Sequence, residues 1–337
     1  MVYVPSLTDY TKIYEVADEM EKDINGHGDI KDEEGNIIKP AKKGIFPPPL
    51  NLEFEKAMRA LFMKKKHYAY MEYASDGTII KEKNSDRENL NVKGIILARR
   101  DNCQWIRKTY ENVIRTIFRA EDISVAFDII IDAIIDVIEL KFDITHELSI
   151  IKSMGSNYKS RTYPLAIFSE LTKEVGRPVN PGERFPFVVV TDHQGRDKMG
   201  YKMRTNELFL EQWESTPYKY GDKIPKDFKS SLGLYPPEEI DSFYYINNVL
   251  MSPIDKLFEY GYLKVIEKYE PYGYEPRFNN RLRRISVRTP VKMVILIIKD
   301  MMENIKKNNK KDTTAVKEVV KDLITLKKWF KDIQFKD

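Results

Sequence analysis

Residues 64–70 read Lys-Lys-Lys-His-Tyr-Ala-Tyr, so three ammonium groups and an imidazole stand beside two phenols at the edge of a β-rich stretch. Three adjacent lysines repel one another, and some of them must therefore face solvent or an anion. Side chains alternate along an extended chain, which predicts that Lys64 and Lys66 leave one face and that Tyr68 shares the face of Lys66. The pattern favours a surface on which cations and aromatic rings meet one anionic partner together.

The residues around this cluster predict a β-rich first third of the chain. Asp76-Gly77 is a hairpin turn signal within the stretch from residue 63 to residue 98. Apolar residues three and four apart predict a helix, and strict alternation predicts a strand. We therefore expect a helix over 6–24, a loop over 25–43 with a small turn at Glu34-Gly35, and strands over 50–55 and 92–98.

Beyond residue 105 the apolar spacing changes to that of helices. We expect helices over 105–118, 123–141, 238–258, 290–307 and 313–333, with a short β segment over 181–190 and a polar stretch after it. The fold class is therefore α+β, a β-rich part followed by a mainly helical part with a small β insertion, and the boundary lies near residue 105.

The composition is that of a globular protein with a heavily charged surface. The 337 residues are 42% apolar and 32% charged, and 56 Lys+Arg against 52 Asp+Glu give a net charge of +4. The charge is uneven, because residues 1–35 carry ten acids and three lysines, whereas six basic residues and no acid lie between Arg277 and Lys292. A basic stripe of this kind attracts polyanions.

The chain carries no motif for a complete catalytic centre. A single cysteine, Cys103, and four scattered histidines exclude a disulfide framework, a Cys-based zinc site and a zincin. Gly-rich phosphate loops and a Gly-x-Ser-x-Gly elbow are absent. Asp128, Asp132 and Asp136 share one helix face, which could carry a metal, but their apolar flanks favour a solvated face. We expect Cys103 to be a small core residue.

The chain shows no targeting segment, and its longest apolar run, 291–298, is too short to cross a bilayer. We therefore expect a soluble intracellular protein without a membrane partner.

Five short motifs stand in the order and spacing of a known family. They are Pro47-Pro48-Pro49, Leu52-Glu53-Phe54-Glu55-Lys56, Lys65-Lys66-His67-Tyr68, Lys93-Gly94 and Arg99-Arg100-Asp101-Asn102-Cys103. Together they resemble a family B DNA polymerase of the kind found in large double-stranded DNA viruses. Two later stretches resemble the polymerase thumb: residues 163–190 with Gly182-Glu183-Arg184, and residues 241–248, which hold a Tyr-Tyr-Ile, with Pro253-Ile254. The resemblance covers nearly the whole chain.

The resemblance implies two domains, the C-terminal portion of the polymerase palm at 1–105 and the thumb at 106–337, with a β insertion at about 181–236. The family's three polymerase motifs, which carry the catalytic aspartates, are absent from this sequence. Residues 1–4 resemble the strand that follows the last of them. We therefore expect no catalytic and no metal-binding residue in this chain. An N-terminal fragment with exonuclease, fingers and catalytic palm would be its partner, and we expect Mg²⁺ only in the polymerase that the two form together. We expect the chain to be inactive alone.

By resemblance, the partner is primer–template DNA, gripped during template-directed nucleotidyl transfer in DNA replication, in cytoplasm or nucleus. Lys65, Lys66 and Tyr68 would contact the minor groove, where acceptors on all four base pairs allow pairing to be read without sequence. His67 replaces the usual Arg of that element. We expect DNA contacts from Lys64, Lys65, Lys66, His67, Tyr68, Lys93, Gly94, Arg99, Arg100, Lys152, Ser156, Asn157, Tyr158, Lys159, Tyr244, Tyr245 and Asn248.

Other functions remain open at this stage. One is a non-catalytic remnant or accessory protein that binds duplex DNA without chemistry. Another is a helical scaffold that uses the stripe at 277–292 for RNA or membrane phosphates. A processivity factor is a possible further partner, although Lys327-Lys328-Trp329-Phe330 lacks the Gln with which clamp-binding peptides begin.

Overall fold

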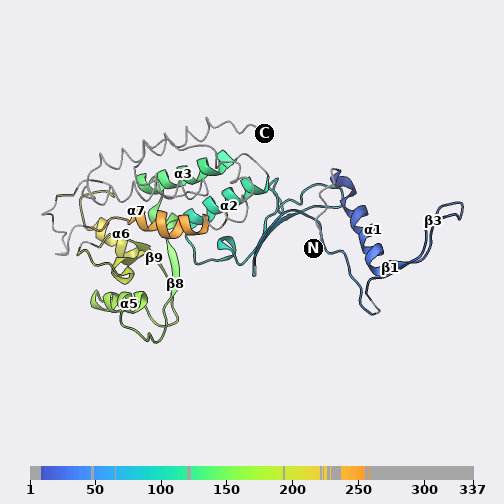
Figure 1. Ribbon diagram of the computed structural model, residues 1–337. Coiled ribbons are helices and arrows are strands. Elements are labelled where there is room, and N and C mark those ends of the chain that lie inside the picture. Colours follow the sequence, from blue (N-terminus) through green and yellow to red (C-terminus); the bar gives the residue numbers. More distant parts are fainter. Residues whose placement is uncertain are drawn as a thin grey trace, which may run out of the picture. The chain divides into compact units, whose positions relative to one another are not determined.

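The computed structural model describes residues 9–46, 49–64, 66–119, 123–192, 194–220, 222, 224–225, 228, 237–254 and 257. The chain divides after Ile95 into two compact units, and each is described by itself (Figure 1). The predicted helices at 290–307 and 313–333, the basic stripe at 277–292 and the segment at 327–330 lie outside the described residues. Within the described part of the chain, no helix is both long and apolar enough to span a bilayer.

The first unit begins with a helix, as the spacing of its apolar residues predicts. A short 3-10 turn, η1 (Tyr10–Lys12), leads into α1 (Ile13–Asn25). The Asp9 carboxylate accepts the backbone N–H of Thr11 at 3.1 Å and caps the start. The helix ends at Gly26, whose φ of 88° suits a residue without a Cβ atom.

The predicted loop over 25–43 is wrong, because this segment forms a narrow two-stranded arm (Figure 1). Strand β1 (Gly26–His27) pairs with β4 (Lys42–Lys43), and β2 (Ile30–Lys31) pairs with β3 (Ile37–Lys39). The side chain of Asp32 accepts three hydrogen bonds from residues 34 and 36 and closes the tip. These local bonds replace a core, and sequence spacing alone does not reveal them.

A three-stranded antiparallel sheet forms the centre of the first unit. Its strands are β5 (Met58–Lys64), β6 (His67–Glu72) and β7 (Asn91–Lys93), in the order β5-β6-β7. Ala69 and Met71 are fully buried on one face. This confirms the β-rich reading of the region, and the turn at Asp76-Gly77 is confirmed by a hydrogen bond of 2.8 Å from Ala74 N–H to the Thr78 carbonyl.

Two predicted strands of this unit are wrong. Residues 50–55 form no strand, because side chains from α1 take their backbone groups: Asn25 bonds both the N–H and the carbonyl of Leu52, and Glu21 accepts the N–H of Phe54. The strand predicted over 92–98 ends at Lys93, because Gly94 turns the chain with a φ of 73°. The chain then enters the 3-10 turn η2 (Ile96–Ala98).

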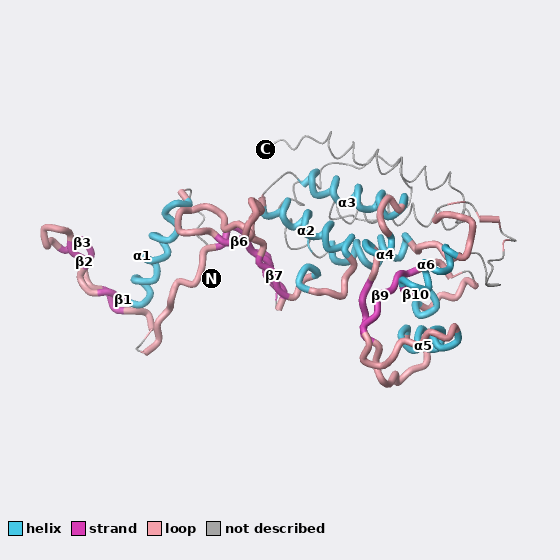
Figure 2. The backbone as a smooth tube through the Cα atoms, turned by 180° about the vertical axis from the view of Figure 1, so that it is seen from behind, coloured by secondary structure: helices cyan, strands magenta, loops and turns pink. Residues whose placement is uncertain are grey.

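In the second unit, α2 (Gln104–Phe118) and α3 (Ile123–Glu139) lie side by side in both views (Figures 1 and 2). Both helices were predicted, and both are confirmed. Ile106 of α2 and Ile134 of α3 are fully buried. The Trp105 indole N–H donates to the Ala133 carbonyl at 3.1 Å, so the polar atom of this large buried side chain has a hydrogen-bond partner. A short helix, α4 (Ile144–Glu147), follows.

A second antiparallel sheet runs β10-β9-β8, with β8 (Ile150–Ser153), β9 (Arg184–Val189) and β10 (Met203–Thr205). The connections carry α5 (Pro164–Glu174), a 3-10 turn η3 (Met199–Lys202) and α6 (Asn206–Glu214). The predicted β segment at 181–190 is confirmed. Among the described residues, β9, β10 and α6 lie within the wider stretch at 181–236, and the strand β8, which pairs with β9, lies before it. The α+β class is confirmed.

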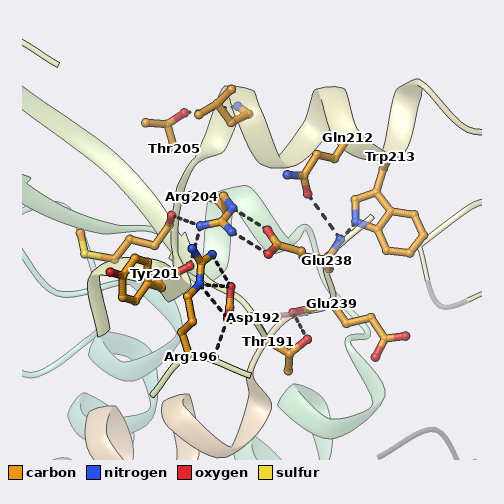
Figure 3. Close-up of polar contacts among 12 residues, drawn as sticks. Thr191, Asp192, Arg196, Tyr201, Arg204, Thr205, Gln212, Trp213, Glu238 and Glu239 are labelled. Atoms are coloured by element: carbon orange, nitrogen blue, oxygen red, sulfur yellow. Dashed lines mark hydrogen bonds and ion pairs between the residues drawn. The ribbon is translucent and has the colours of Figure 1, made fainter. Parts of the chain in front are cut away.

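A network of ion pairs fixes the segment that follows residue 237 (Figure 3). Arg204 donates to Glu238 at 2.6 Å, and both side chains are largely buried. Arg196 donates to Asp192 at 2.7 Å and lies 4.1 Å from the centroid of the Tyr201 ring. Burial alone would raise the pKa of Asp192, but the hydrogen bonds from Arg196 outweigh it, and the pKa lies below its usual value.

The fixed segment leads into the last described helical turns, α7 (Ser242–Tyr244) and η4 (Tyr245–Met251), a turn of π-helix. The Asp241 carboxylate caps α7 by accepting the Tyr244 N–H at 3.0 Å. The Ser242 hydroxyl donates to the Val137 carbonyl of α3 at 3.1 Å. The helix predicted over 238–258 is therefore confirmed over residues 242–254.

Candidate nucleic-acid interface

The open face of the first sheet carries cations against aromatic rings. In the register of β6 and β7, Tyr68 stands opposite Lys93 and Tyr70 stands opposite Asn91, so these four side chains share one face. The Lys93 ammonium lies 5.8 Å from the centroid of the Tyr68 ring, a cation–π distance. The rings of Tyr68 and Tyr70 are 6.0 Å apart. This face joins a positive charge to two half-buried phenols.

Lys56 extends the same face, and the site residues expected from the sequence do not include it. Its ammonium donates to the Tyr70 hydroxyl at 3.3 Å and lies 5.4 Å from the ring centroid. A hydrogen bond to Glu55 and then one to Tyr70 raise the pKa of Lys56 above its usual value. Lys56 therefore stays charged beside Tyr70. The sequence pattern around Lys56 does not predict its contact with Tyr70, which is 14 residues further along the chain.

The β5–β6 connection places the lysine cluster differently from the alternation expected. Lys64 pairs with His67, and Lys66, between them in sequence, lies in a turn with a φ of 64°. The side chains of Lys66 and His67 are exposed. The extended backbone that the alternation required at Lys66 is therefore not found. Lys65 lies outside the described residues.

A second basic cluster lies in the second unit, around Asp101. The Asp101 carboxylate lies 3.3 Å from the Arg99 guanidinium and 3.6 Å from the Lys152 ammonium. Within the Arg99-Arg100-Asp101 motif, Asp101 therefore pairs with an arginine two residues before it. The Ile151 N–H also donates to the Asp101 carbonyl at 3.1 Å, which ties β8 to the start of α2. Arg100 is exposed.

The loop after β8 holds the next group of expected residues. Ser156, Asn157 and Lys159 are exposed, and Tyr158 is half-buried. The Tyr158 hydroxyl accepts the Gly155 N–H at 2.6 Å, so the ring is anchored within its own loop. Arg161, Tyr163 and Arg184 are exposed in or beside this loop, and none was expected from the sequence. For Arg161 and Tyr163 the signal, a run without acids from Ser149 to Ser169, is visible in the sequence, whereas Arg184 lies outside that run.

Tyr245 is not available to a nucleic acid, which corrects its expected role. It is fully buried, and its hydroxyl accepts the Val189 N–H at 3.0 Å and donates to the Leu148 carbonyl at 2.9 Å. Burial raises the pKa of Tyr245 well above its usual value. Tyr244 is half-buried and Asn248 is exposed, and Asn248 accepts a hydrogen bond from Asn247.

The comparison with protein families decides what the chain is. Residues 7–260 match the family model for DNA polymerase family B. The chain belongs to DNA polymerase family B. The resemblance found in the sequence is therefore confirmed.

Two curated relatives and one solved structure illustrate the family B match. The chain is 27% identical to the DNA polymerase delta catalytic subunit of Glycine max, over 75% of this chain and 20% of that protein. It is 44% identical to the DNA polymerase 120R of Invertebrate iridescent virus 3, over 22% of this chain and 6% of that protein. The family B DNA polymerase from the hyperthermophilic archaeon Pyrobaculum calidifontis matches with a TM-score of 0.35 at 16% identity, over 62% of this chain and 21% of that one. The chain thus spans about a fifth or less of each of these proteins.

The described residues of this family B chain form no carboxylate cluster that could bind a metal ion. Among the residues that the structure describes, no group of three or more His, Cys, Asp or Glu side chains could hold an ion. On α3, Asp132 is exposed and Asp136 is half-buried, and burial raises the pKa of Asp136. Cys103 is buried, as expected, and desolvation raises the pKa of its thiol to about 12. Neither feature forms a catalytic centre.

Proposed function

We propose that this chain is the portion of a family B DNA-directed DNA polymerase that grips the primer–template duplex during DNA replication. Residues 1–105 would form the C-terminal part of the palm, and residues 106–337 the thumb. The observation that carries the proposal is the Lys93–Tyr68 pair on the open face of β6 and β7, beside the exposed Lys66 and His67. A polymerase must hold every sequence, and cations on phosphates and minor-groove acceptors do so.

The cluster of Arg99, Arg100 and Lys152 in the second unit would contact the backbone of duplex DNA. Two observations support this role. Arg100 is exposed, and Arg99 and Lys152 share one carboxylate, that of Asp101, which balances only one of their two charges. Two cations on one carboxylate leave a net positive charge for phosphate. Ser156, Asn157 and Lys159 would add contacts from the loop after β8.

The catalytic carboxylates and the divalent metal ions would come from elsewhere in the polymerase. Nucleotidyl transfer by two metal ions needs carboxylates that hold them, and the described part of this chain offers no such cluster. We therefore propose an N-terminal polypeptide, with exonuclease, fingers and catalytic palm, as partner, and Mg²⁺ as its metal. The complex would act where DNA is replicated, and a processivity factor is a further candidate partner.

Duplex binding tests the proposal directly. We expect fluorescence anisotropy with a labelled primer–template to show tight binding that weakens linearly with the logarithm of salt concentration. Lys93→Ala should make that slope shallower by about 0.9, the value for one lost phosphate contact. Lys42→Ala removes the same charge from the arm, where Lys42 pairs with Asp23 at 3.5 Å, and should leave the slope unchanged.

Primer extension separates the polymerase from a non-catalytic binding protein. The chain alone with Mg²⁺ should extend no primer, whereas addition of the N-terminal partner should give extension that Lys93→Ala reduces. Extension by the chain alone would refute the division of labour. A slope that is unchanged in Lys93→Ala would refute the proposed grip.

A further inference from the structure

Two tyrosines, Tyr158 and Tyr163, stack in the loop between β8 and α5. The ring centroids of Tyr158 and Tyr163 are 5.3 Å apart, and the ring planes differ by 26°. The Tyr158 hydroxyl accepts the Gly155 N–H and lies 3.1 Å from the Met154 sulfur, so the inner ring is fixed. Tyr163 stacks on this inner ring, and it directly precedes Pro164, the first residue of α5. The stack is therefore a rigid platform.

The outer ring of this platform is open to solvent. Tyr163 is 50% exposed although one of its faces packs on Tyr158. A large aromatic ring that is held in place and left half-exposed is a ready contact surface, because a ligand can cover it without an entropy cost for ordering the ring. The hydroxyls of Ser160 and Thr162 bond each other at 2.8 Å and hold the intervening turn.

The charge around the platform is positive. Lys159 and Arg161 flank Ser160, and the chain has no acid between Ser149 and Ser169. The fold brings Glu183 to this loop, because its backbone carbonyl accepts the Met154 N–H at 2.9 Å, and its carboxylate accepts the Asn180 N–H at 2.9 Å. Among the described residues, neither Lys159 nor Arg161 forms an ion pair with a carboxylate.

We propose that Tyr163, Lys159 and Arg161 form a binding site for an unpaired nucleotide of single-stranded DNA. The base would stack on the open face of Tyr163, and the cations would contact its phosphates. Inside a duplex, neighbouring bases already cover both faces of each base, so the open ring suits a base outside the helix. Stacking of this kind tolerates any sequence, because every base has a π-face.

This site shares Lys159 with the proposed duplex grip and differs from it at Tyr163 and Arg161, and it rests on the proposed function in that both take DNA. The duplex contacts join Lys93 to the Tyr68 ring on a sheet, whereas this platform offers the open face of one ring from a loop. The two can therefore be tested apart by two ligands and two sets of variants.

The experiment measures the affinity of the full chain for a labelled oligothymidylate and for a labelled blunt duplex, at about 50 mM salt. Tyr163→Ala should weaken oligothymidylate binding about five- to a hundredfold and change duplex binding less than about twofold. Tyr163→Phe keeps the ring and should bind as the unmodified chain does. Circular dichroism of each variant should match the unmodified chain, because Tyr163 is exposed.

Tyr10 provides a matched control within the same protein. It is 48% exposed and stacks on Tyr73 at 5.1 Å, but it stands between Asp9 and Thr11. Tyr10→Ala should therefore leave oligothymidylate binding unchanged. If Tyr163→Ala binds oligothymidylate as tightly as the unmodified chain, or loses both ligands equally, the platform is refuted. If Lys93→Ala still alters the duplex salt slope in that case, the proposed function stands; if the chain binds neither ligand, both proposals fall.

Discussion

The carbonyl oxygen of Lys66 lies directly against Gly94, and a Cβ atom at position 94 would overlap it. Both residues have positive φ, 64° for Lys66 and 73° for Gly94. The contact joins the β5–β6 turn to the end of β7, one residue after Lys93. A backbone contact between two residues far apart in sequence thus holds Lys93 across from Tyr68.

Gly94→Ala should destabilise the first sheet by about 2–4 kcal/mol. The new methyl group meets the Lys66 carbonyl, and alanine also pays about 1–2 kcal/mol for a left-handed conformation. Amide hydrogen exchange of β6 and β7 measures this, because Trp105, Trp213 and Trp329 all follow residue 95 and their fluorescence does not report the first unit. Gly182→Ala has the same kind of φ, 85°, with no atom within 4 Å, and should cost only the conformational part. Unchanged protection of β6 in Gly94→Ala would contradict the contact.

Asp101→Asn should tighten duplex binding about two- to fivefold at about 50 mM salt. The carboxylate lies 3.3 Å from Arg99 and 3.6 Å from Lys152, and its neutralisation frees both cations for phosphate. The salt dependence should become steeper, since more counterions are released. Asp18→Asn, which removes the partner of Lys22 at 2.6 Å on α1, is the charge-matched control and should have no such effect. Weaker binding by Asp101→Asn would show that the carboxylate orients the cations instead.

Tyr245→Phe should lower the free energy of unfolding of the second unit by about 2–4 kcal/mol and leave duplex affinity unchanged. The hydroxyl bonds the Val189 N–H and the Leu148 carbonyl, and its loss leaves both buried groups without this partner. Urea unfolding followed by Trp fluorescence measures the loss. Tyr244→Phe, at the neighbouring half-buried position, should cost under about 1 kcal/mol. A selective loss of duplex affinity in Tyr245→Phe would restore the role expected from the sequence.

Alkaline pH should destabilise the second unit. Desolvation raises the pKa values of the Cys103 thiol and the Tyr110 phenol to about 12, from ordinary values of 9.0 and 10.0. Unfolding therefore releases protons above pH 9, so stability is complete below pH 9 and is lost as pH rises toward 12. Burial also raises the pKa values of Tyr220, Tyr244 and Tyr245. The free energy of unfolding should therefore be about 2–3 kcal/mol smaller at pH 10 than at pH 8. Cys103→Ala should show only about half of this difference; an equal difference in the variant would contradict the role of the thiol.

Local signals in the sequence were sufficient for several elements. The period of α2 and α3 and the turn at Asp76-Gly77 depend on residues close together in the chain, and all were predicted. The arm after α1 was missed because Asp32 and two glycines, Gly26 and Gly44, build it through polar bonds and close backbone approach, without apolar periodicity.

By itself, the sequence determined the α+β class, the family and the concentration of cations and phenols near residue 66, because composition, periodicity and motif order are properties of the chain in one dimension. Only the tertiary structure decided which of those side chains meet. It turned Lys66 out of the strand, placed Lys93 over Tyr68, shared Asp101 between Arg99 and Lys152, and buried Tyr245. These outcomes depend on strand register and on packing between distant segments, and no local pattern encodes either.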